Sequence, residues 1–205
     1  MKNWFNKLIF SIVVLTILNF PLTASASHTA FLENIVFPVK NIMSHFYDDW
    51  DEIRGSGNRT HDGLDIRSKK GTPIVAIADG VVNTIAYTEA SGYYIAIDHG
   101  NGWLSLYVHL NDDIVGNDNL GGFETALADK IYLGANVVGG QEIGYVGDSG
   151  NAEGTVPHVH FELRYRGVPQ DIFKYVKASF ERFELSFRAP KKIGLNPFLI
   201  NYIFI

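Results

Sequence analysis

Residues 92–110 read GYYIAIDHGNGWLSLYVHL, and this stretch decides how the chain folds. Two runs rich in β-branched and aromatic residues lie on either side of the pair Asn101-Gly102. An Asn-Gly pair tolerates the positive φ angles of the tight turns that join antiparallel strands. The stretch therefore predicts a β-hairpin.

Similar short runs continue on both sides of this hairpin, from about Gly55 to Gly167. They read PIVAIA, GVVNTIAYT, QEIGYVG and HVHFELRYR, and Gly, Asn and Asp separate them. Regular short strands with turn residues between them are typical of an all-β sandwich or barrel rather than of βαβ units. We therefore expect a mainly β fold.

Three segments depart from this β pattern. Residues 36–50 carry apolar side chains at helical spacing, which predicts a helix there. Residues 111–130 are polar and rich in Gly, which is typical of a long loop or a small insertion. From Asp171 onward the apolar positions again fall on one helical face, so a second helix is expected. The last twelve residues, GLNPFLINYIFI, are apolar but too short to span a membrane, and we expect a terminal strand or a tail packed on the core.

The first 26 residues have the features of an export signal. Lys2 and Lys7 give a positive start, residues 8–18 are apolar, and Ala24-Ser25-Ala26 supplies small residues for cleavage. At ~1.5 Å per residue the apolar run reaches about 16 Å, whereas a hydrocarbon core needs roughly 30 Å. We expect a cleaved signal peptide over residues 1–26 and no membrane span after cleavage. An uncleaved anchor is the alternative.

The composition excludes several classes of protein. Without residues 1–26 the chain keeps 15 basic against 22 acidic side chains, a net charge of −7, which gives no electrostatic basis for binding nucleic acid. The chain contains no cysteine, so it has neither a disulfide nor a site for a lipoprotein anchor. The expected location is the periplasm, the cell wall or the extracellular space.

Histidines in two short motifs indicate a metal site. His61 and Asp65 are four residues apart in THDGLDI, and His158 and His160 are two apart in PHVHFEL. A strand would point both histidines of the second motif to the same face. Zinc takes imidazole nitrogens and carboxylate oxygens, and catalytic sites leave one coordination position to water. H-x-x-x-D alone occurs often by chance, whereas H-x-H is a better signal because histidines are uncommon in strands. Neither motif is decisive without its surroundings.

Those surroundings resemble the lysostaphin-type (LytM-like) peptidoglycan endopeptidases. The segments GNRTHDGLDI, GTPIVAIADGVV, GYYIAIDHGNGWLSLYVHL, GQEIGYVGDSG and GTVPHVHFELRYRG occur in the order of that family, from about Gly57 to Gln170. The resemblance implies a curved antiparallel sheet with short flanking helices and a groove above the metal. It also implies an exported metalloendopeptidase that binds one Zn²⁺ and hydrolyses peptide bonds of peptidoglycan.

Carried over residue by residue, the resemblance assigns His61, Asp65 and His160 as zinc ligands. It makes His109 and His158 the unliganded catalytic histidines, and which of them is the general base stays open. Family members cut glycine-rich bridges or D-Ala-containing crosslinks, and the sequence does not decide between them.

The resemblance also divides the chain. Residues 1–26 form the signal peptide and 27–56 an N-terminal extension. The zinc peptidase domain spans 57–170 with an insertion at 111–130, and 171–205 form a C-terminal extension. The oligomeric state is not predicted.

Other polar candidates receive structural interpretations. His99 lies at a turn position where the family also carries histidine, and Tyr107 fits a strand aromatic in the core better than a substrate contact. His28 and His45 lie outside the matched region and are expected to be surface or core side chains. Asn58 stands where family members often line the groove.

Two other classes of function fit parts of the pattern. A non-catalytic relative that binds the wall or activates an amidase typically lacks one or more ligands, whereas all are present here. A lipoyl or biotinyl carrier would fit GTPIVAIADGVV, but such domains need a modifiable Lys in an exposed turn, usually beside Met. Neither Met1 nor Met43 lies near such a Lys.

Overall fold

The hairpin around Asn101-Gly102 lies in the main sheet of the computed structural model, which describes residues 29–57, 59–116 and 118–188. Strands β6 (Gly92–Gly100) and β7 (Trp103–Leu110) pair antiparallel, and the φ angles of Asn101 and Gly102 are 52° and 90°. These positive values are the ones that the Asn-Gly pair supplies. The hairpin prediction is confirmed.

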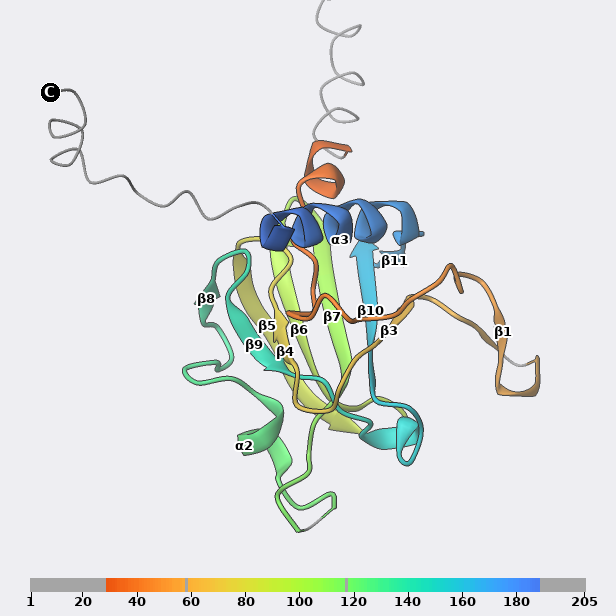
Figure 1. The fold of residues 1–205 in the computed structure, drawn as a ribbon, viewed down its shortest axis with the longest axis vertical. Helices are drawn as coiled ribbons and strands as arrows, with labels where there is room; N and C mark the ends of the chain where they lie inside the picture. Colours follow the sequence, from red (N-terminus) through yellow and green to blue (C-terminus); the bar gives the residue numbers. More distant parts are fainter. Residues whose placement is uncertain (1–28, 58, 117, 189–205) are drawn as a thin grey trace, which may run out of the picture.

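A seven-stranded antiparallel sheet is built around this hairpin (Figure 1). Its order is β11-β10-β7-β6-β5-β8, and β3 pairs with the first half of β10. The bounds of the added strands are β3 (Leu64–Arg67), β5 (Gly80–Thr88), β8 (Asn136–Val137), β10 (His158–Tyr165) and β11 (Val168–Pro169).

Two small strand pairs complete the β structure. Strand β4 (Pro73–Val75) pairs with β9 (Glu142–Tyr145), and β1 (Ile53–Arg54) pairs with β2 (Arg59–Thr60) through the 3₁₀ turn η1 (Gly55–Gly57). The main sheet does not close into a barrel over the described residues. The predicted mainly β, antiparallel fold with few short helices is confirmed, in its open form.

The core lies on one face of the main sheet. Strand β10 alternates, so that Val159, Phe161 and Leu163 are fully buried in it. Tyr107 of β7 is also buried, and its hydroxyl accepts a hydrogen bond from the backbone N–H of Ile77 at 2.9 Å. The core interpretation of Tyr107 is therefore confirmed, and the opposite face of β7 and β10 stays open for a groove.

The helix predicted at residues 36–50 is wrong. Between residues 29 and 50 the chain is helical only at 29–33. The rest of this segment is turns and irregular chain, with isolated bridges from Val39 to Ile74 and from His45 to Arg67. Phe37 and Val39 are buried in the core, and the backbone bonds to the edges of β3 and β4. Pairing with neighbouring strands satisfies the peptide groups that a helix would have satisfied internally.

The second predicted helix is present as α3 (Phe173–Arg188), which lies across one end of the sheet (Figure 1). Its Phe180 packs edge-on against Phe37 with ring centroids 4.8 Å apart, and Arg182 donates to the carbonyl of Ile35 at 2.9 Å. The described residues 111–116 and 118–130 are mostly loop and contain the short helix α2 (Gly122–Ala126).

Several sequence predictions lie outside the described residues. They are the signal peptide at 1–26, His28, Asn58 and the apolar tail at 194–205. Within the described ranges, no helix combines the length and apolar character needed to cross a membrane.

Candidate metal centre

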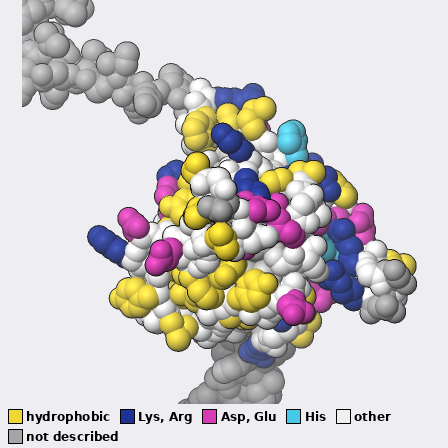
Figure 2. Space-filling view, turned by 90° about the horizontal axis from the view of Figure 1, so that it is seen from below, with side chains coloured by type: hydrophobic (Ala, Val, Ile, Leu, Met, Phe, Trp, Pro, Cys, Tyr) yellow, Lys and Arg dark blue, Asp and Glu magenta, His cyan; other side chains and the backbone are white. Residues whose placement is uncertain are grey.

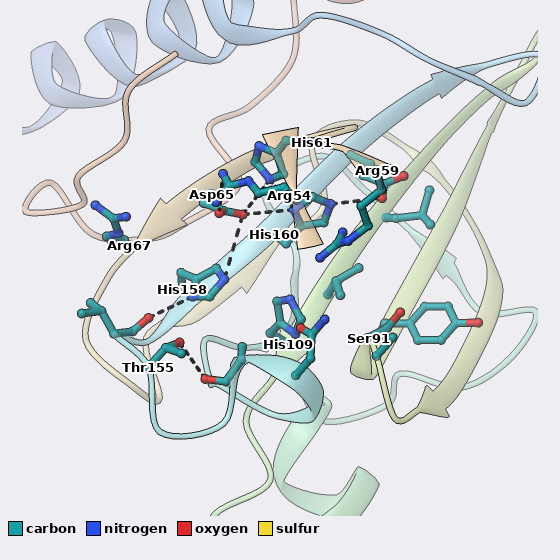
Figure 3. A pocket seen from close by; sticks show the side chains of 18 of the residues that line it. Arg54, Arg59, His61, Asp65, Arg67, Ser91, His109, Thr155, His158 and His160 are labelled. Carbon is teal, nitrogen blue, oxygen red and sulfur yellow. Dashed lines mark hydrogen bonds and ion pairs between the residues drawn. The ribbon is translucent and has the colours of Figure 1, made fainter. Parts of the chain in front are cut away.

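A groove of about 660 Å³ lies on the open face of the main sheet (Figure 3). Its floor comes from alternate residues of β10, namely His158, His160, Glu162 and Arg164. The residues between them point into the core, because successive strand side chains face opposite sides. The prediction that His158 and His160 share one face is confirmed.

The structure brings His61, Asp65 and His160 together at one end of this groove. His61 Nε2 lies 2.9 Å from His160 Nδ1 and 3.1 Å from Asp65 Oδ1. His160 Nδ1 lies 3.0 Å from the same Asp65 oxygen. Pairing of β3 with β10 sets this arrangement, because Asp65 is the register partner of His160.

Outer contacts decide which ring nitrogens face inward. His61 Nδ1 lies 2.9 Å from the backbone carbonyl of Asp49 and donates its proton there. His160 Nε2 lies 3.0 Å from Glu162 Oε1 and donates to that carboxylate, which also accepts from Arg164. In the neutral form of each ring, the inward nitrogen then carries a lone pair that a metal ion can accept.

This donor set fits zinc. Two imidazole lone pairs and one carboxylate oxygen converge within 3.1 Å of one another, and such an arrangement is repulsive until a cation or a proton lies between them. Two nitrogens and one oxygen match the ligands of catalytic zinc sites, and the groove leaves the fourth side accessible. Outer partners of the kind seen on His61 and His160 accompany most metal-bound histidines.

The electrostatics of the site favour positive charge. Burial opposes a charge on His61, but hydrogen bonds to Asp49 and Asp65 outweigh it and raise the pKa of His61 to about 10. Burial also disfavours a charge on His160, yet its contacts with Asp65 and Glu162 raise the pKa of its ring. The same two histidines hold the pKa of Asp65 far below its usual range, against the effect of burial.

Asp49 and Arg54 belong to this site, although neither was a candidate from the sequence. The Asp49 carboxylate is 1% exposed and accepts from Arg54 at 3.2 Å, while Arg54 also lies 3.4 Å from Asp65 Oδ2. The N-terminal segment thus contributes to the support of the metal ligands. The acidic run at 48–51 was the only sequence signal, and it does not identify a partner.

His109 enters the groove through an unusual backbone conformation. Alternation along β7 would place it on the core face with Tyr107, but its φ angle is +62° and its ring lines the groove beside Val108. This left-handed conformation is rare for residues with a side chain and is found often at functional sites. His109 Nδ1 donates to the carbonyl of Ser149 at 2.9 Å, which leaves Nε2 with its lone pair.

His158 lies near both His109 and the proposed ligand Asp65. Its Nδ1 donates to the carbonyl of Val156 at 2.9 Å, and its Nε2 lies 4.0 Å from Asp65 Oδ1. The rings of His158 and His109 have their centroids 5.1 Å apart. Burial lowers the pKa of His109 to about 4, so this ring is neutral over the physiological range.

The remaining candidates lie away from the groove. Both nitrogens of His99 are bonded, to the carbonyl of Asp79 and to the Ser105 hydroxyl, each at 2.8 Å, which confirms its structural role. His45 is exposed, and only its backbone pairs with Arg67.

Parts of this chain are similar to known peptidases. Residues 59–120 match Peptidase family M23. The DD-carboxypeptidase/endopeptidase Mpg of Neisseria meningitidis is 36% identical over 111 residues, which are 54% of this chain and 21% of that protein. The peptidoglycan DD-endopeptidase ShyA of Vibrio cholerae is 33% identical over 56% of this chain and 22% of its own length.

A solved structure, of a zinc-containing peptidase from Vibrio cholerae, is similar with a TM-score of 0.53 and 26% identity. The match covers 67% of this chain and 38% of that protein. By contrast, the chain spans about a fifth of the length of Mpg and of ShyA.

Proposed function

Because residues 59–120 match peptidase family M23, we propose that this chain is an exported zinc metalloendopeptidase that hydrolyses peptide bonds of bacterial peptidoglycan. One observation carries the proposal. His61 Nε2, Asp65 Oδ1 and His160 Nδ1 converge within 3.1 Å at one end of an open groove, with their outer contacts arranged to leave lone pairs inward.

His61, Asp65 and His160 would hold one Zn²⁺. When bound, zinc would lower the pKa of a water and polarise a substrate carbonyl. With Zn²⁺ bound, the single negative charge of Asp65 would leave the centre with a net positive charge. The guanidinium of Arg54, 3.4 Å from Asp65 Oδ2, would offset part of the carboxylate charge. The ligand roles are supported by the donor set and by the family.

His158 and His109 would assist proton transfer from the attacking water and to the leaving amine. Each donates Nδ1–H to a backbone carbonyl and presents Nε2 as an acceptor. Nε2 of His158 lies 4.0 Å from Asp65 Oδ1. We assign His158 as the residue that takes the proton of the attacking water at Nε2. The resulting imidazolium can donate to the leaving amine, and His109, which stays neutral and keeps Nε2 as an acceptor, can orient the attacking water through a hydrogen bond.

The substrate class follows from the relatives and the expected export. Two relatives are named as enzymes that act on DD-peptide bonds, one of them on peptidoglycan. We therefore propose D-Ala-containing crosslinks, rather than glycine-rich bridges, as the bonds that are cut. The periplasm or the cell wall is the compartment in which the enzyme would meet them.

Mass spectrometry of fragments released from purified peptidoglycan tests the proposal. The zinc-loaded protein should release peptides cleaved at D-Ala crosslinks. Asp65→Ala and His160→Ala should lose both zinc and activity, and His158→Ala should retain zinc but lose most turnover. His45→Ala, an exposed histidine outside the groove, is the matched control. Zinc-loaded protein that releases no fragments, or a fully active His158→Ala variant, would contradict the assignment.

A further inference from the structure

A second group of carboxylates lies outside the groove, where the 111–121 loop meets the segment 148–153. Ligand atoms of Asp112, Asp148 and Glu153 all lie within 4.8 Å of one another. Asp113 and Asp118 of the same loop border the group. In the view from below, acidic side chains are visible near the middle of this end of the molecule, and basic side chains gather at one side (Figure 2).

Asp112 is the feature that points to a ligand. The residue is 5% exposed, and its Oδ1 has no hydrogen-bond partner within the part of the chain that the structure describes. A buried carboxylate oxygen without a partner is costly, since it has lost its contact with water and gained no hydrogen bond in exchange. Buried charges of this kind are normally paired or bound to metal ions.

The nearby cation is paired with carboxylates other than that of Asp112. Lys70 pairs with Asp113 and with Asp148 Oδ1, the latter at 2.6 Å. Among the described residues, the ion pairs of Lys70 are with Asp113 and Asp148 and not with Asp112 or Glu153, so that one ammonium faces a group of five carboxylates. Burial and then the charges of Asp113 and Asp148 raise the pKa of Asp112, which shows how poorly its anion is stabilised.

Two of the three carboxylates, those of Asp112 and Glu153, line a separate cavity of about 240 Å³. Asp112, Asn119 and Glu153 line it together with Tyr87 and Tyr93. All the candidate donors are oxygens, in contrast to the nitrogen-rich groove. Hard cations with flexible coordination, calcium above all, prefer such oxygen-only sets.

We propose that the carboxylates of Asp112, Asp148 and Glu153 bind a calcium ion. Calcium fits better than magnesium because the donors come from separate loops and from Glu153 at an exposed position, an arrangement that suits irregular coordination rather than a strict octahedron. The affinity should lie near that of extracellular calcium modules, with a dissociation constant on the order of 0.1–1 mM.

Calcium bound at this site would affect the groove through Ser149, which contacts His109. Ser149 directly follows Asp148, and its carbonyl accepts from His109 Nδ1 at 2.9 Å, while its hydroxyl donates to the carbonyl of Leu110. The 3₁₀ turn η2 (Gly150–Ala152) comes next, and its Asn151 and Ala152 line the groove. A cation on Asp148 and Glu153 would hold both ends of this turn and so hold the partner of His109.

Terbium luminescence provides a direct test, because Tyr87 and Tyr93 line the cavity and can transfer energy to a bound lanthanide. The full zinc-loaded protein should show tyrosine-sensitised emission that calcium displaces. Asp112→Asn should weaken calcium binding by about 100-fold or more, since even outer partners of metal sites contribute roughly 10–100-fold. Asp129→Asn, an exposed change at the end of the same insertion, should bind like the parent.

Thermal unfolding separates this role from a structural one. Without calcium, Asp112→Asn should be as stable as the parent or more so, because an unpaired buried charge is removed. Calcium should raise the melting temperature of the parent and of Asp129→Asn but not of Asp112→Asn, and should slow amide exchange at residues 148–153. Equal shifts with sodium chloride at matched ionic strength would overturn the proposal. So would terbium emission that Asp112→Asn leaves unchanged.

Discussion

The backbone carbonyl of Asp49 lies 2.9 Å from Nδ1 of His61, twelve residues further along the chain. The contact ties the N-terminal segment to the candidate metal centre. It also directs the Nε2 lone pair of His61 toward Asp65 and His160. A segment outside the matched peptidase motifs thereby determines the orientation of a metal ligand.

Replacing Arg54 tests this outer support. Arg54→Ala would leave the buried Asp49 carboxylate without its guanidinium and would free Asp65 Oδ2. Since Arg54 is about one-third exposed, we expect a loss of roughly 1–3 kcal/mol in the free energy of unfolding. Zinc affinity should fall by about 10–100-fold. Calorimetric zinc titration and urea unfolding measure the two effects. Arg59→Ala, on the paired strand of the same hairpin, should change neither by a comparable amount.

Zinc binding should release protons. In the metal-free protein the pKa of His61 is raised to about 10, so its ring carries a proton at pH 8 that the metal must displace. Titration calorimetry in buffers of different ionisation enthalpy gives the number of protons released. An apparent enthalpy independent of the buffer would mean that the inward nitrogens are already unprotonated, and would contradict the raised pKa.

His109 should make stability depend on pH. Its pKa is lowered to about 4 in the folded state, from about 6.5 when unfolded, so the unfolded chain binds the proton more tightly. The stabilisation is therefore complete above about pH 6.5 and is lost as the pH falls toward 4, by at most about 3 kcal/mol.

His109→Asn isolates this contribution. Asn tolerates the positive φ of position 109, does not titrate, and should flatten the difference between unfolding free energies at pH 7 and pH 5. The comparison is made with both proteins zinc-loaded, so that the metal ligands contribute equally. Parallel pH profiles for the parent and the variant would refute the role given to His109.

Gly63 should tolerate no side chain. A Cβ there would lie 2.6 Å from the carbonyl oxygen of Phe161 and 2.8 Å from the ring of His160. Gly63→Ala must therefore separate β3 from β10 or displace His160, with an expected cost of about 1–3 kcal/mol and weaker zinc binding. Gly139→Ala, where the nearest atom would be 3.3 Å away, is the control for the loss of a glycine. Normal zinc affinity in Gly63→Ala would show that β10 yields without moving its histidine.

Interactions between neighbouring residues determined the central hairpin and part of the groove. Asn101-Gly102 determined the central hairpin, because only a turn with positive φ angles closes it tightly. Strand alternation determined that His158 and His160 share the groove face, because side chains two apart on a strand point the same way. Both features depend on neighbouring residues alone, and the sequence was sufficient for them.

Tertiary contacts decided the rest. The apolar spacing of residues 36–50 predicted a helix, but strand edges of β3 and β4 bonded the backbone of that segment instead. His109 left the face that alternation assigns to it, because its backbone turns left-handed where it bonds to Ser91 and its ring bonds to Ser149. Asp49, Arg54 and the carboxylates around Asp112 come together only through long-range packing. No short motif encodes such partners, since the free energy of each contact depends on which distant segments the fold has buried beside it.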